Sequence, residues 1–518
     1  MTTTIKMLPG ECWWGGTTIN KKCPVTEYNE YHEDFRYDAR NQTGLMFVSD
    51  LGRYIWSAEP FKVDAKDGVF TFEGGEIELN SDGTSLKEAY LNIQKAHFPS
   101  DKRRLNDKFF EGALYNTWMQ FTYYPTQEKV LEYARDIIAN GFEPGILIID
   151  EGWHQHTAYG SWEFDFARFP DPKKMCDELH NLGFTLMLWV VPFVNAAGPE
   201  YVRSLRPLVG TDPEMAKHLY MRTTDGQVAL IPWWNGACAI LDFTDPYNCE
   251  FLDRKLKHLM DAYGVDGFKF DGGTTQHYAK KCLNGELATD KTPAQLNNAW
   301  NEFGLRYEFH EYKDSFCMGG KNAIQRLHDR AHSWTNNGLD DLLPCAFVNG
   351  LIGHPFTCPD MVGGGEWSTR YTPGFKVDEE LFVRMAQCSA LFPMLQFSWA
   401  PWEALSEKNL KLCRDMAKLH KRMAPDILRF VRSAEETGEP IFRLLEYNYP
   451  HKGYKLVQDE FMLDKEILVA PVLTPETYER VVVFPEGRWQ AEDGTVYEGE
   501  KVITLPAPIE KLLWFKKL

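Results

Sequence analysis

The 518-residue chain has no regular arrangement of cysteines. Its eleven cysteines are scattered singly and form no C-x-x-C pair. Cysteines of this kind are typically reduced and buried, whereas a secreted disulfide scaffold places them at regular spacings. The sequence therefore favours a reducing compartment.

Long hydrophobic runs are also absent. No stretch of about 18 consecutive apolar residues occurs, so the sequence indicates no membrane-spanning helix. The first residues, Met1-Thr2-Thr3-Thr4-Ile5-Lys6, lack the apolar core of a signal peptide. We expect a soluble, cytoplasmic protein, unless a signal sequence has been removed.

Positive charge is scarce relative to negative charge. The 56 Lys and Arg residues stand against 74 Asp and Glu residues, which gives a formal net charge of −18. Nucleic acids and anionic membranes would repel such a chain, so neither is an expected partner. No glycine-rich phosphate-binding motif follows a strand, so nucleotide chemistry is not expected either. The sequence gives no indication of the oligomeric state.

No cofactor or metal site is indicated. His154-Gln155-His156 has the alternation that would present two ligands from a strand, but only loop residues surround it. A metal-dependent barrel hydrolase would need clusters of His and carboxylates at strand ends, and His is nearly absent there. We expect neither a metal nor a cofactor.

The most informative stretch that is present runs from 249 to 273. An apolar pattern of helical spacing covers 249–263, and Gly264 suits a left-handed helix end. Residues 265–270 read as a strand, on which Lys269 and Asp271 share a face. Gly272 and Gly273 would let a ligand approach the backbone. Alternatively, Lys269 and Asp271 form only a salt bridge at a solvent-exposed end of the strand and bind no ligand.

The same cycle of helix, glycine and strand recurs from 112 to 404. Residues 126–140 and 145–150 form one cycle around Gly141, and residues 173–182 and 184–192 form the next around Gly183. Repeated parallel strands with crossover helices over about 300 residues predict an α/β fold of the (β/α)8 TIM-barrel type.

The flanking regions differ from this pattern. Residues 1–111 contain short alternating runs such as 68–73 and 76–79, which predict an N-terminal β-sandwich-like domain. Residues 405–423 predict a last helix, and runs such as 466–472 and 479–485 predict a C-terminal β-sandwich, so that 405–518 forms a third domain.

Polar residues follow several of the apolar strands. In a TIM barrel the carboxyl ends of the strands build the active site. The residues that would lie there are Asp150, Glu151, Asn195, Asp271 and Asp360.

Several longer motifs stand in a fixed order along the chain. They are Trp233-Trp234-Asn235-Gly236, Leu241-Asp242-Phe243-Thr244, Phe268-Lys269-Phe270-Asp271, Asp329-Arg330 with Trp334, Gly353-His354-Pro355-Phe356, Pro359-Asp360-Met361-Val362-Gly363-Gly364, Gln396-Phe397-Ser398 and Ile467-Leu468-Val469-Ala470-Pro471-Val472. From about Tyr115 onwards this series resembles glycoside hydrolase family 31. Within that family it most resembles the branch of the animal myogenesis-regulating glycosidase and related bacterial α-galactosidases.

The resemblance implies a retaining glycosidase with two catalytic carboxyl groups. Such enzymes place a nucleophile and an acid/base about 5–5.5 Å apart. Asp271 matches the family nucleophile, and Asp329 matches the acid/base when the segment is aligned on Trp334. The adjacent Arg330 would lower the pKa of Asp329, which is unsuitable for an acid unless the Arg points away. Nearby competitors for this role are Asp314, Asp340 and Asp341, the last two read as solvated helix charges.

Further residues are implied as substrate contacts. They are Asp150, Glu151, Trp234, Lys269, Lys313 and Asp360. Lys269 would hold Asp271 ionised and donate to sugar hydroxyls, or serve only as an ion-pair partner. Asp360 would contact sugar or brace its loop. Lys313 would replace an Arg of the family pattern.

Two departures from the common family pattern bear on the substrate. The α-glucosidases of the family carry an Arg-Ser and an Arg-Asn-His, where this chain has Glu311-Tyr312-Lys313-Asp314-Ser315 and Leu395-Gln396-Phe397-Ser398. The missing His argues against glucose specificity. The Gln-Phe-Ser variant is shared with the galactosidase-like branch that the chain resembles, so the resemblance implies terminal α-galactosides, whose axial O4 needs a differently shaped pocket wall. An α-glucosidase, an α-N-acetylgalactosaminidase and a non-catalytic sugar-binding protein remain alternatives.

Overall fold

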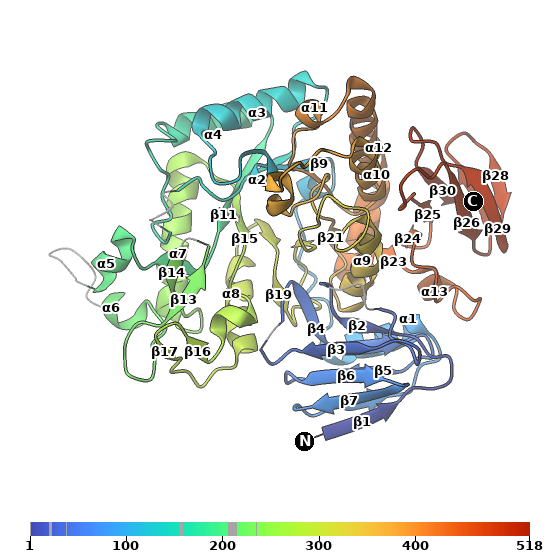
Figure 1. The fold of residues 1–518 in the computed structure, drawn as a ribbon, viewed down its shortest axis with the longest axis horizontal. Coiled ribbons are helices and arrows are strands. Elements are labelled where there is room, and N and C mark those ends of the chain that lie inside the picture. Colours follow the sequence, from blue (N-terminus) through green and yellow to red (C-terminus); the bar gives the residue numbers. More distant parts are fainter. Residues whose placement is uncertain (1, 20–22, 38, 155–158, 206–214, 235) are drawn as a thin grey trace.

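The computed structural model describes residues 2–19, 23–37, 39–154, 159–205, 215–234 and 236–518. Three parts follow one another along the chain: N-terminal sheets, a central barrel and C-terminal sheets (Figure 1). Over these ranges we find no helix that combines the length and apolarity needed to cross a membrane.

The N-terminal part is built from antiparallel strands. Its strands are β1 (Thr2–Lys6), β2 (Trp13–Thr17), β3 (Tyr31–Asp34), β4 (Gln42–Ser49), β5 (Tyr54–Trp56), β6 (Lys62–Lys66), β7 (Val69–Glu73) and β8 (Glu78–Asn80), followed by the helix α1 (Leu86–His97). One sheet has the order β1-β7-β6-β3. The second includes β19 (Ser315–Phe316) from the barrel, which pairs with β4, so the two parts share a sheet.

The central part is a parallel barrel, as predicted. Its eight-stranded sheet consists, in spatial order, of β21 (Thr357–Cys358), β20 (Gln325–Arg326), β18 (Phe309–Tyr312), β15 (Gly267–Phe270), β11 (Thr185–Val190), β10 (Ile146–Ile149), β9 (Ala113–Asn116) and β22 (Leu395–Phe397). A parallel bridge between Val362, just past β21, and Phe397 of β22 joins the two ends of this sheet. The carboxyl ends of all these strands therefore meet at one mouth.

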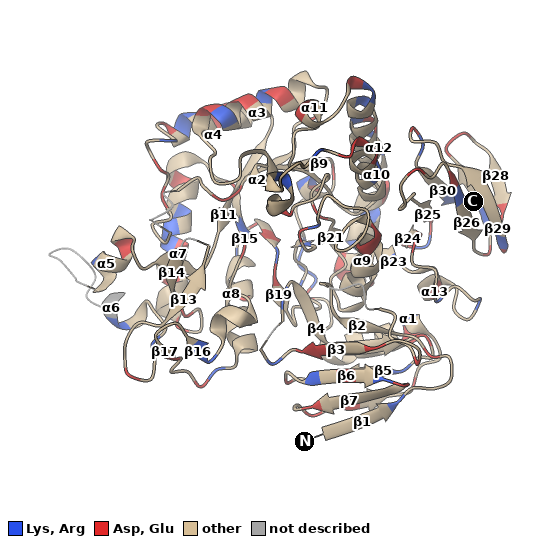
Figure 2. Cartoon of the chain, in the orientation of Figure 1, with Lys and Arg blue, Asp and Glu red and all other residues tan. Residues whose placement is uncertain are grey.

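The crossover helices form where the apolar spacing predicts them. They include α3 (Gln127–Ala139), α4 (Pro172–Asn181) and α7 (Pro246–His258), and Thr126 and Asp171 cap the first two through their side chains. The helix before β15 ends in a π-helical turn, η3 (Leu259–Tyr263), and Gly264 follows with a φ of 88°, as its left-handed role requires. Acidic and basic residues are mixed along the outer helices α3 and α4 (Figure 2).

A long excursion separates β11 from α7. It contains α5 (Pro199–Leu205), α6 (Met215–His218) and an antiparallel three-stranded sheet of β12 (Phe193–Asn195), β14 (Gly236–Ile240) and β13 (Leu230–Trp233). The turn between β13 and β14 carries Trp234 over the barrel mouth, where its ring stacks on Trp189 of β11.

The helix predicted for 405–423 is longer than the sequence suggests. The helix α12 runs over Glu407–Thr437 and contains Pro425 in its interior. Proline usually ends a helix because it removes a hydrogen bond. Here the apolar face continues beyond it through Ile427, Phe430 and Val431, all buried, and this packing holds the helix together.

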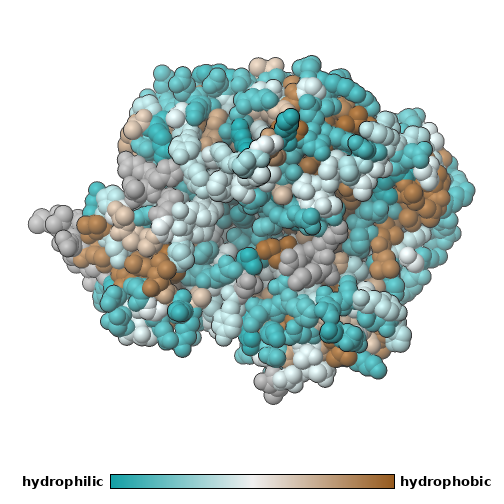
Figure 3. Space-filling model, viewed as in Figure 1, coloured by the Kyte–Doolittle hydropathy of each residue, from teal (hydrophilic) through white to brown (hydrophobic). Residues whose placement is uncertain are grey.

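The C-terminal part consists of two sheets. One has the order β23 (Phe442–Arg443), β24 (Phe461–Leu463), β25 (Ile467–Ala470), β30 (Leu513–Lys517), β27 (Arg488–Ala491) and β28 (Val496–Glu498), and the other pairs β26 (Glu479–Phe484) with β29 (Lys501–Pro506). Strands β25 and β26 lie within the predicted runs. Hydrophobic residues gather at the surface of this part and around the β13–β14 sheet, while most of the rest of the face in Figure 3 is hydrophilic.

Candidate active site at the barrel mouth

Asp271 lies directly after β15, at the mouth of the barrel. Its carboxylate accepts hydrogen bonds from Trp189 Nε1 at 2.8 Å and from the backbone N–H of Gly272 at 2.7 Å. Burial acts to raise the pKa of Asp271, but Lys313, Lys269 and these two donors outweigh it and lower the pKa below the usual value. Asp271 is therefore a buried, ionised carboxylate in a fixed orientation.

Lys269, two residues earlier on β15, points into the barrel as predicted. Its Nζ lies 2.5 Å from Oδ2 of Asp150, which follows β10, and the side-chain amide of Asn116 donates to the same oxygen at 2.9 Å. Both partners of this ion pair are buried. The direct partner of Lys269 is therefore Asp150, and its effect on Asp271 is electrostatic.

Glu151 is buried beside these groups. Its backbone N–H donates to Oδ1 of Asp150 at 2.9 Å. Burial, together with the charges of Asp150 and Asp271, raises the pKa of Glu151 well above the usual value. The mouth thus contains two buried carboxyl groups, Glu151 and Asp271, whose pKa values are shifted in opposite directions.

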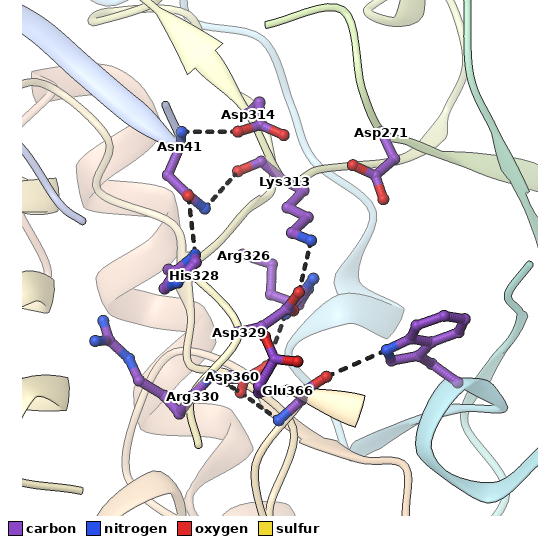
Figure 4. Close-up of polar contacts among 12 residues, drawn as sticks. Asn41, Asp271, Lys313, Asp314, Arg326, His328, Asp329, Arg330, Asp360 and Glu366 are labelled. Carbon is purple, nitrogen blue, oxygen red and sulfur yellow. Dashed lines mark hydrogen bonds and ion pairs between the residues drawn. The ribbon is translucent and has the colours of Figure 1, made fainter. Parts of the chain in front are cut away.

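Lys313 follows β18 and lies between the two proposed catalytic carboxylates (Figure 4). Its Nζ donates to Oδ2 of Asp329 at 2.6 Å. Burial acts to lower the pKa of Lys313, but Asp329 and Asp271 together raise it above the usual value. One partly buried ammonium group therefore couples Asp271 to Asp329 electrostatically.

Asp329 is held by cations, although not by the Arg that the sequence suggested. Arg326 of β20 donates through Nη1 to Oδ1 of Asp329 at 2.9 Å, whereas the side chain of Arg330 points away from Asp329 (Figure 4). Arg330 donates instead to Oδ1 of Asn337 at 3.1 Å. Burial acts to raise the pKa of Asp329, but Lys313 and Arg326 outweigh it and hold the pKa far below the usual value. Asp329 is therefore ionised in this structure.

The competing carboxylates are placed differently. Asp314 is buried, accepts from the backbone N–H of Asn41 at 2.7 Å, and has a pKa raised to about 6 by burial and by the charge of Asp271. Asp340 and Asp341 lie in the 3-10 turn η5 (Leu339–Asp341), and both are partly buried rather than fully solvated as expected. Asp341 accepts from the backbone of Asn337 at 2.9 Å.

Asp360 has the contacts of a bracing residue. Its two oxygens accept from Nη1 of Arg326 at 2.7 Å, from the backbone N–H of Arg330 at 2.6 Å and from that of Gly365 at 2.7 Å. These bonds tie the loop after β21 to the segment that carries Asp329. Of the two roles considered for Asp360, these contacts match the bracing of its loop.

Sequence reasoning overlooked Glu311 and the role of Gln396. Glu311 lies on β18 beside Lys269 and is fully buried, and its carboxylate accepts from Nε2 of Gln396 at 2.8 Å. Its other oxygen lies 3.7 Å from Nε of Arg326. Burial raises its pKa. The sequence signal that could have identified Glu311 is a Glu in a short stretch between aromatic residues, Phe309 and Tyr312.

Aromatic rings form one side of the mouth. Trp234 stacks on Trp118 with centroids 5.7 Å apart and on Trp189 with centroids 6.0 Å apart, both at 20° between planes. The ring of Trp233 is also stacked on that of Trp234, with the two centroids 4.7 Å apart. Trp234 remains 45% exposed, which suits a ring that receives a ligand.

No group of three or more potential ligands that could hold a metal ion occurs in the described ranges. His154 is buried beside Trp153, while Gln155 and His156 lie outside those ranges. Asn195, the remaining strand-end residue, is buried in β12.

Comparison with known sequences identifies the family of the chain. Residues 112–428 match the glycosyl hydrolases family 31 TIM-barrel domain, and residues 438–517 match the glycosyl hydrolase family 31 C-terminal domain. The chain belongs to glycosyl hydrolase family 31. The family expected from the sequence motifs is therefore confirmed.

Individual members of family 31 resemble the chain over most of its length. The myogenesis-regulating glycosidase of Mus musculus is 29% identical over 435 residues, covering 83% of this chain and 59% of the relative. Alpha-glucosidase 2 of Bacillus thermoamyloliquefaciens is 28% identical, covering 76% and 51%. The chain thus spans only part of the length of these relatives.

The fold is shared with solved members of the family. A dextranase from Flavobacterium johnsoniae, solved in complex with glucose, superposes with a TM-score of 0.83 at 19% identity, covering all of this chain and 66% of the dextranase. The barrel, the N-terminal sheets and the C-terminal strands therefore form a known arrangement.

Proposed function

We propose that the protein is a retaining exo-α-glycosidase that hydrolyses terminal α-galactosides, with Asp271 as nucleophile and Asp329 as acid/base. The observation that carries the proposal is the environment of Asp271. Its carboxylate is buried, ionised and oriented by two neutral donors at the end of a barrel strand. A nucleophilic carboxylate needs these properties.

The proposed reaction takes two steps. In the first, an oxygen of Asp271 attacks the anomeric carbon while Asp329 gives a proton to the departing aglycone oxygen. In the second, Asp329 takes a proton from water, which attacks the same carbon and releases Asp271. Two inversions give net retention of the anomeric configuration.

Asp329 must carry a proton for the first step. In the unliganded site Lys313 and Arg326 hold it ionised. A sugar hydroxyl that accepts a hydrogen bond from Lys313 would draw that ammonium group from Asp329 and raise the pKa of the carboxyl. In this proposal substrate binding therefore prepares the acid.

The galactoside preference rests on the end of β22. Ser398 stands where the family pattern has a large polar side chain, and its hydroxyl accepts from the backbone N–H of Met119 at 2.7 Å. The side-chain amide of Gln396 donates to Glu311 within the barrel. We infer that a pocket wall with these residues in place of a His contact accepts an axial hydroxyl better than one built for glucose. The relatives named for α-glucosidase activity make α-glucosides the first competing substrates.

The test is parallel hydrolysis of 4-nitrophenyl α-galactoside, α-glucoside, α-xyloside and α-N-acetylgalactosaminide by the wild type and by Asp271→Asn. Galactoside turnover that disappears in the variant supports substrate and nucleophile together. Turnover of another glycoside alone would refute the galactoside preference and leave the mechanism. An active variant would refute the role of Asp271, and no turnover by the wild type would favour a sugar-binding protein.

The cysteines bear on the expected location. Among the described residues the cysteines form no disulfide with one another, and most of them are buried. This state suits a reducing compartment, and we include a cytoplasmic location in the proposal.

A further inference from the structure

The interior of the barrel carries charged and polar side chains where such barrels usually pack branched apolar ones. We name this set the polar layer, and its members are Asp150, Lys269, Glu311, Arg326 and Gln396. All five are at most 2% exposed. Because taking charges out of water costs free energy, a buried cluster of this kind calls for a role beyond packing.

Glu311 is the charged member of the polar layer that the proposed mechanism does not use. It lies on β18 in register with Lys269 of β15, and its Oε2 accepts a hydrogen bond from Nε2 of Gln396 at 2.8 Å. The side chain is 0% exposed, so it lies out of reach of a substrate. Any effect of Glu311 on the reaction must therefore pass through a neighbouring side chain.

The second oxygen of Glu311 lies close to Arg326. The distance from Oε1 of Glu311 to Nε of Arg326 is 3.7 Å, which is short enough for an ion pair and too long for a hydrogen bond. In the part of the chain that the structure describes, neither of these two buried atoms has a hydrogen-bond partner. A small movement of the guanidinium group would therefore satisfy both atoms at once.

Arg326 is shared by three carboxylates. Its Nη1 donates to Oδ1 of Asp329 at 2.9 Å and to Oδ1 of Asp360 at 2.7 Å, whereas Glu311 lies on the side of its Nε. All three carboxylates act to raise the pKa of Arg326. The guanidinium group thus stands between the proposed acid/base and a carboxylate that takes no part in the chemistry.

The proposed reaction requires Arg326 to change partners. Asp329 must take up a proton before it can act as an acid, and a neutral carboxyl group attracts a guanidinium group far less than a carboxylate does. When the charge of Asp329 disappears, Arg326 remains buried and charged, so it needs another carboxylate within reach. Glu311 is placed to receive it, because closing the 3.7 Å gap gives Nε the hydrogen bond that it lacks.

The surroundings of Glu311 suit this role. The groups that face it from the surrounding strands are Lys269, Arg326, Gln396, Asp150 and Cys358. Burial is the largest influence and leaves the pKa of Glu311 above the usual value, although the two cations and the amide act to lower it. Burial also raises the pKa of the Cys358 thiol well above the usual value, so this thiol stays neutral. An approach of Arg326 would lower the pKa of Glu311 and stabilise its ionised form.

We propose that Glu311 is a positioning residue for the acid/base, because it receives the guanidinium group of Arg326 when Asp329 is protonated and returns it when Asp329 is ionised. The inference rests on the proposed glycosidase function, in which Asp329 gives a proton in the first step and takes one in the second. Asp329 takes up its first proton from the solvent as substrate binds. Glu311 keeps its charge, so no proton passes between the two carboxyl groups.

The test compares the wild type with Glu311→Gln, which removes the charge and keeps the size of the side chain. Without its alternative partner Arg326 stays on Asp329 and keeps the pKa of that carboxyl low. The alkaline limb of the pH profile of kcat reports the acid in the enzyme–substrate complex. We expect this limb to move to lower pH by about one unit.

A leaving-group comparison separates this effect from a general structural defect. At neutral pH, kcat/KM of Glu311→Gln should fall about tenfold more for a disaccharide than for the 2,4-dinitrophenyl glycoside of the same terminal sugar, since one pKa unit corresponds to this factor and the aryl leaving group needs little protonation. The pair is galactosyl-α-1,6-glucose with the aryl galactoside, or maltose with the aryl glucoside if the wild type hydrolyses only glucosides.

Two further variants serve as rescue and control. Glu311→Asp keeps the charge on a shorter side chain, so its alkaline limb should lie between those of the wild type and Glu311→Gln. It carries the test by itself if Glu311→Gln shows no cooperative urea unfolding. Glu308→Gln neutralises an exposed carboxylate immediately before β18 and should leave the limb and the leaving-group comparison as in the wild type.

A limb that stays in place in the Glu311 variants would overturn the inference. An equal loss with both leaving groups would do the same, because a merely structural defect gives that result. If the wild type hydrolyses no glycoside, the proposed function fails, and a double-mutant cycle of urea unfolding with Glu311→Gln and Asp329→Asn still tests the coupling. The two effects should not add, since both carboxylates hold the same guanidinium group, and additive effects would refute the role of Glu311.

Discussion

The two halves of the barrel mouth hold their carboxylates by different means. In the half formed by β10, β11 and β15, the hydrogen bonds that Asp271 accepts from the described residues come from neutral N–H groups, and the ammonium group of Lys269 is bonded to Asp150. In the half formed by β18, β20 and β21, Asp329 is bound directly by Lys313 and Arg326. Asp271 is oriented without a direct cationic partner. Asp329 is ionised and its charge is balanced by two direct cationic partners, which it must release before it can take up a proton and act as an acid.

The difference also concerns which parts of the chain support each half. The Asp271 half is supported mainly by barrel residues, and among the described residues its tie to the N-terminal part lies beyond the carboxylate, where Thr275 exchanges hydrogen bonds of 2.9 and 3.0 Å with the backbone of Ala39. The Asp329 half is supported in addition by the N-terminal sheets, because the side-chain amide of Gln42 donates to the carbonyls of Lys313 and Arg326, each at 2.9 Å. Asn41 adds a bond from its amide to the carbonyl of Lys313 at 3.2 Å. The N-terminal domain therefore positions the cationic half of the site.

The largest expected effect is on the Asp271 half. Asp271→Asn should lower kcat by about 10⁴-fold or more, because the amide cannot form the glycosyl ester. Asp261→Asn, an exposed carboxylate on η3, is the matched control. Asp271→Gly with added azide should form the β-glycosyl azide, since a single displacement inverts the anomeric centre. Formation of the α-azide would contradict the assignment.

The next effect tests the acid in the other half. Asp329→Ala should slow glycosides with poor leaving groups by about 10²–10⁴-fold and 4-nitrophenyl glycosides much less, because a good leaving group needs little protonation. Azide should restore turnover with the α-glycosyl azide as product, since two displacements retain configuration. Asp314→Asn is the competitor, because its pKa of about 6 would also suit an acid. If Asp314→Asn shows the leaving-group dependence and the azide rescue while Asp329→Ala does not, the acid/base is Asp314 and not Asp329.

Removing the shared cation should make the two halves more alike. Lys313→Met should lower kcat/KM by about 10²-fold, as expected for loss of a charged donor at the reacting centre. The pKa of both Asp271 and Asp329 should rise, because Lys313 lowers both. The pH profile of kcat/KM should therefore move to higher pH. Lys313→Arg, which keeps the charge, should leave the profile in place, and a profile unmoved by Lys313→Met would show that Lys313 does not couple the carboxylates.

The same variant has an expected signature in stability. A carboxyl group whose pKa is lowered by folding stabilises the protein above its unfolded-state pKa, near 3.8 for Asp, and this contribution is lost as the pH falls through the folded-state pKa. Because Lys313→Met brings the folded-state pKa of both groups closer to the unfolded one, the gain in Tm between strongly acidic and neutral pH should be smaller than in the wild type.

The smallest expected effect tests the N-terminal contribution. Gln42→Ala removes the side-chain donor to the carbonyl of Arg326 and one of the two side-chain donors to the carbonyl of Lys313, and it should lower the free energy of unfolding by about 1–3 kcal/mol. Urea denaturation measures this, with Gln490→Ala in the C-terminal sheet as the control. We expect kcat to fall more than KM changes for Gln42→Ala, because Lys313 and Arg326 would be less well positioned. Loss of stability with unchanged kinetics would limit Gln42 to a structural role.

The Asp271 half could be predicted from the sequence because its features are local. Strands β10, β11 and β15 are apolar runs that follow glycine-terminated helices, and the polar residue after each run falls at the barrel mouth in any fold of this type. The positions of Asp150, Lys269 and Asp271 follow from this pattern, with the shared face of Lys269 and Asp271 fixed by strand alternation.

The Asp329 half could not be predicted in the same way. Its strands β20 and β21 have two residues each, too few for a pattern, and β18 carries His and Glu within it. The sequence placed Arg330 beside Asp329, yet the chain direction there turns Arg330 towards Asn337 and brings Arg326 to the carboxylate. Adjacency along a chain does not determine which way a side chain points in a segment without regular structure.

The sequence by itself determined the family and the barrel, and strand periodicity placed Asp271 at the barrel mouth, because motif order and periodicity are properties of the linear chain. Only the tertiary structure decided which cations bind Asp329, that Gln42 supports them, and that aromatic rings from separate loops meet at the mouth. These contacts join residues far apart in sequence, such as Gln42 with Arg326 and Trp118 with Trp367. Their geometry is set by barrel closure and by the packing of the N-terminal sheet, which no local pattern encodes.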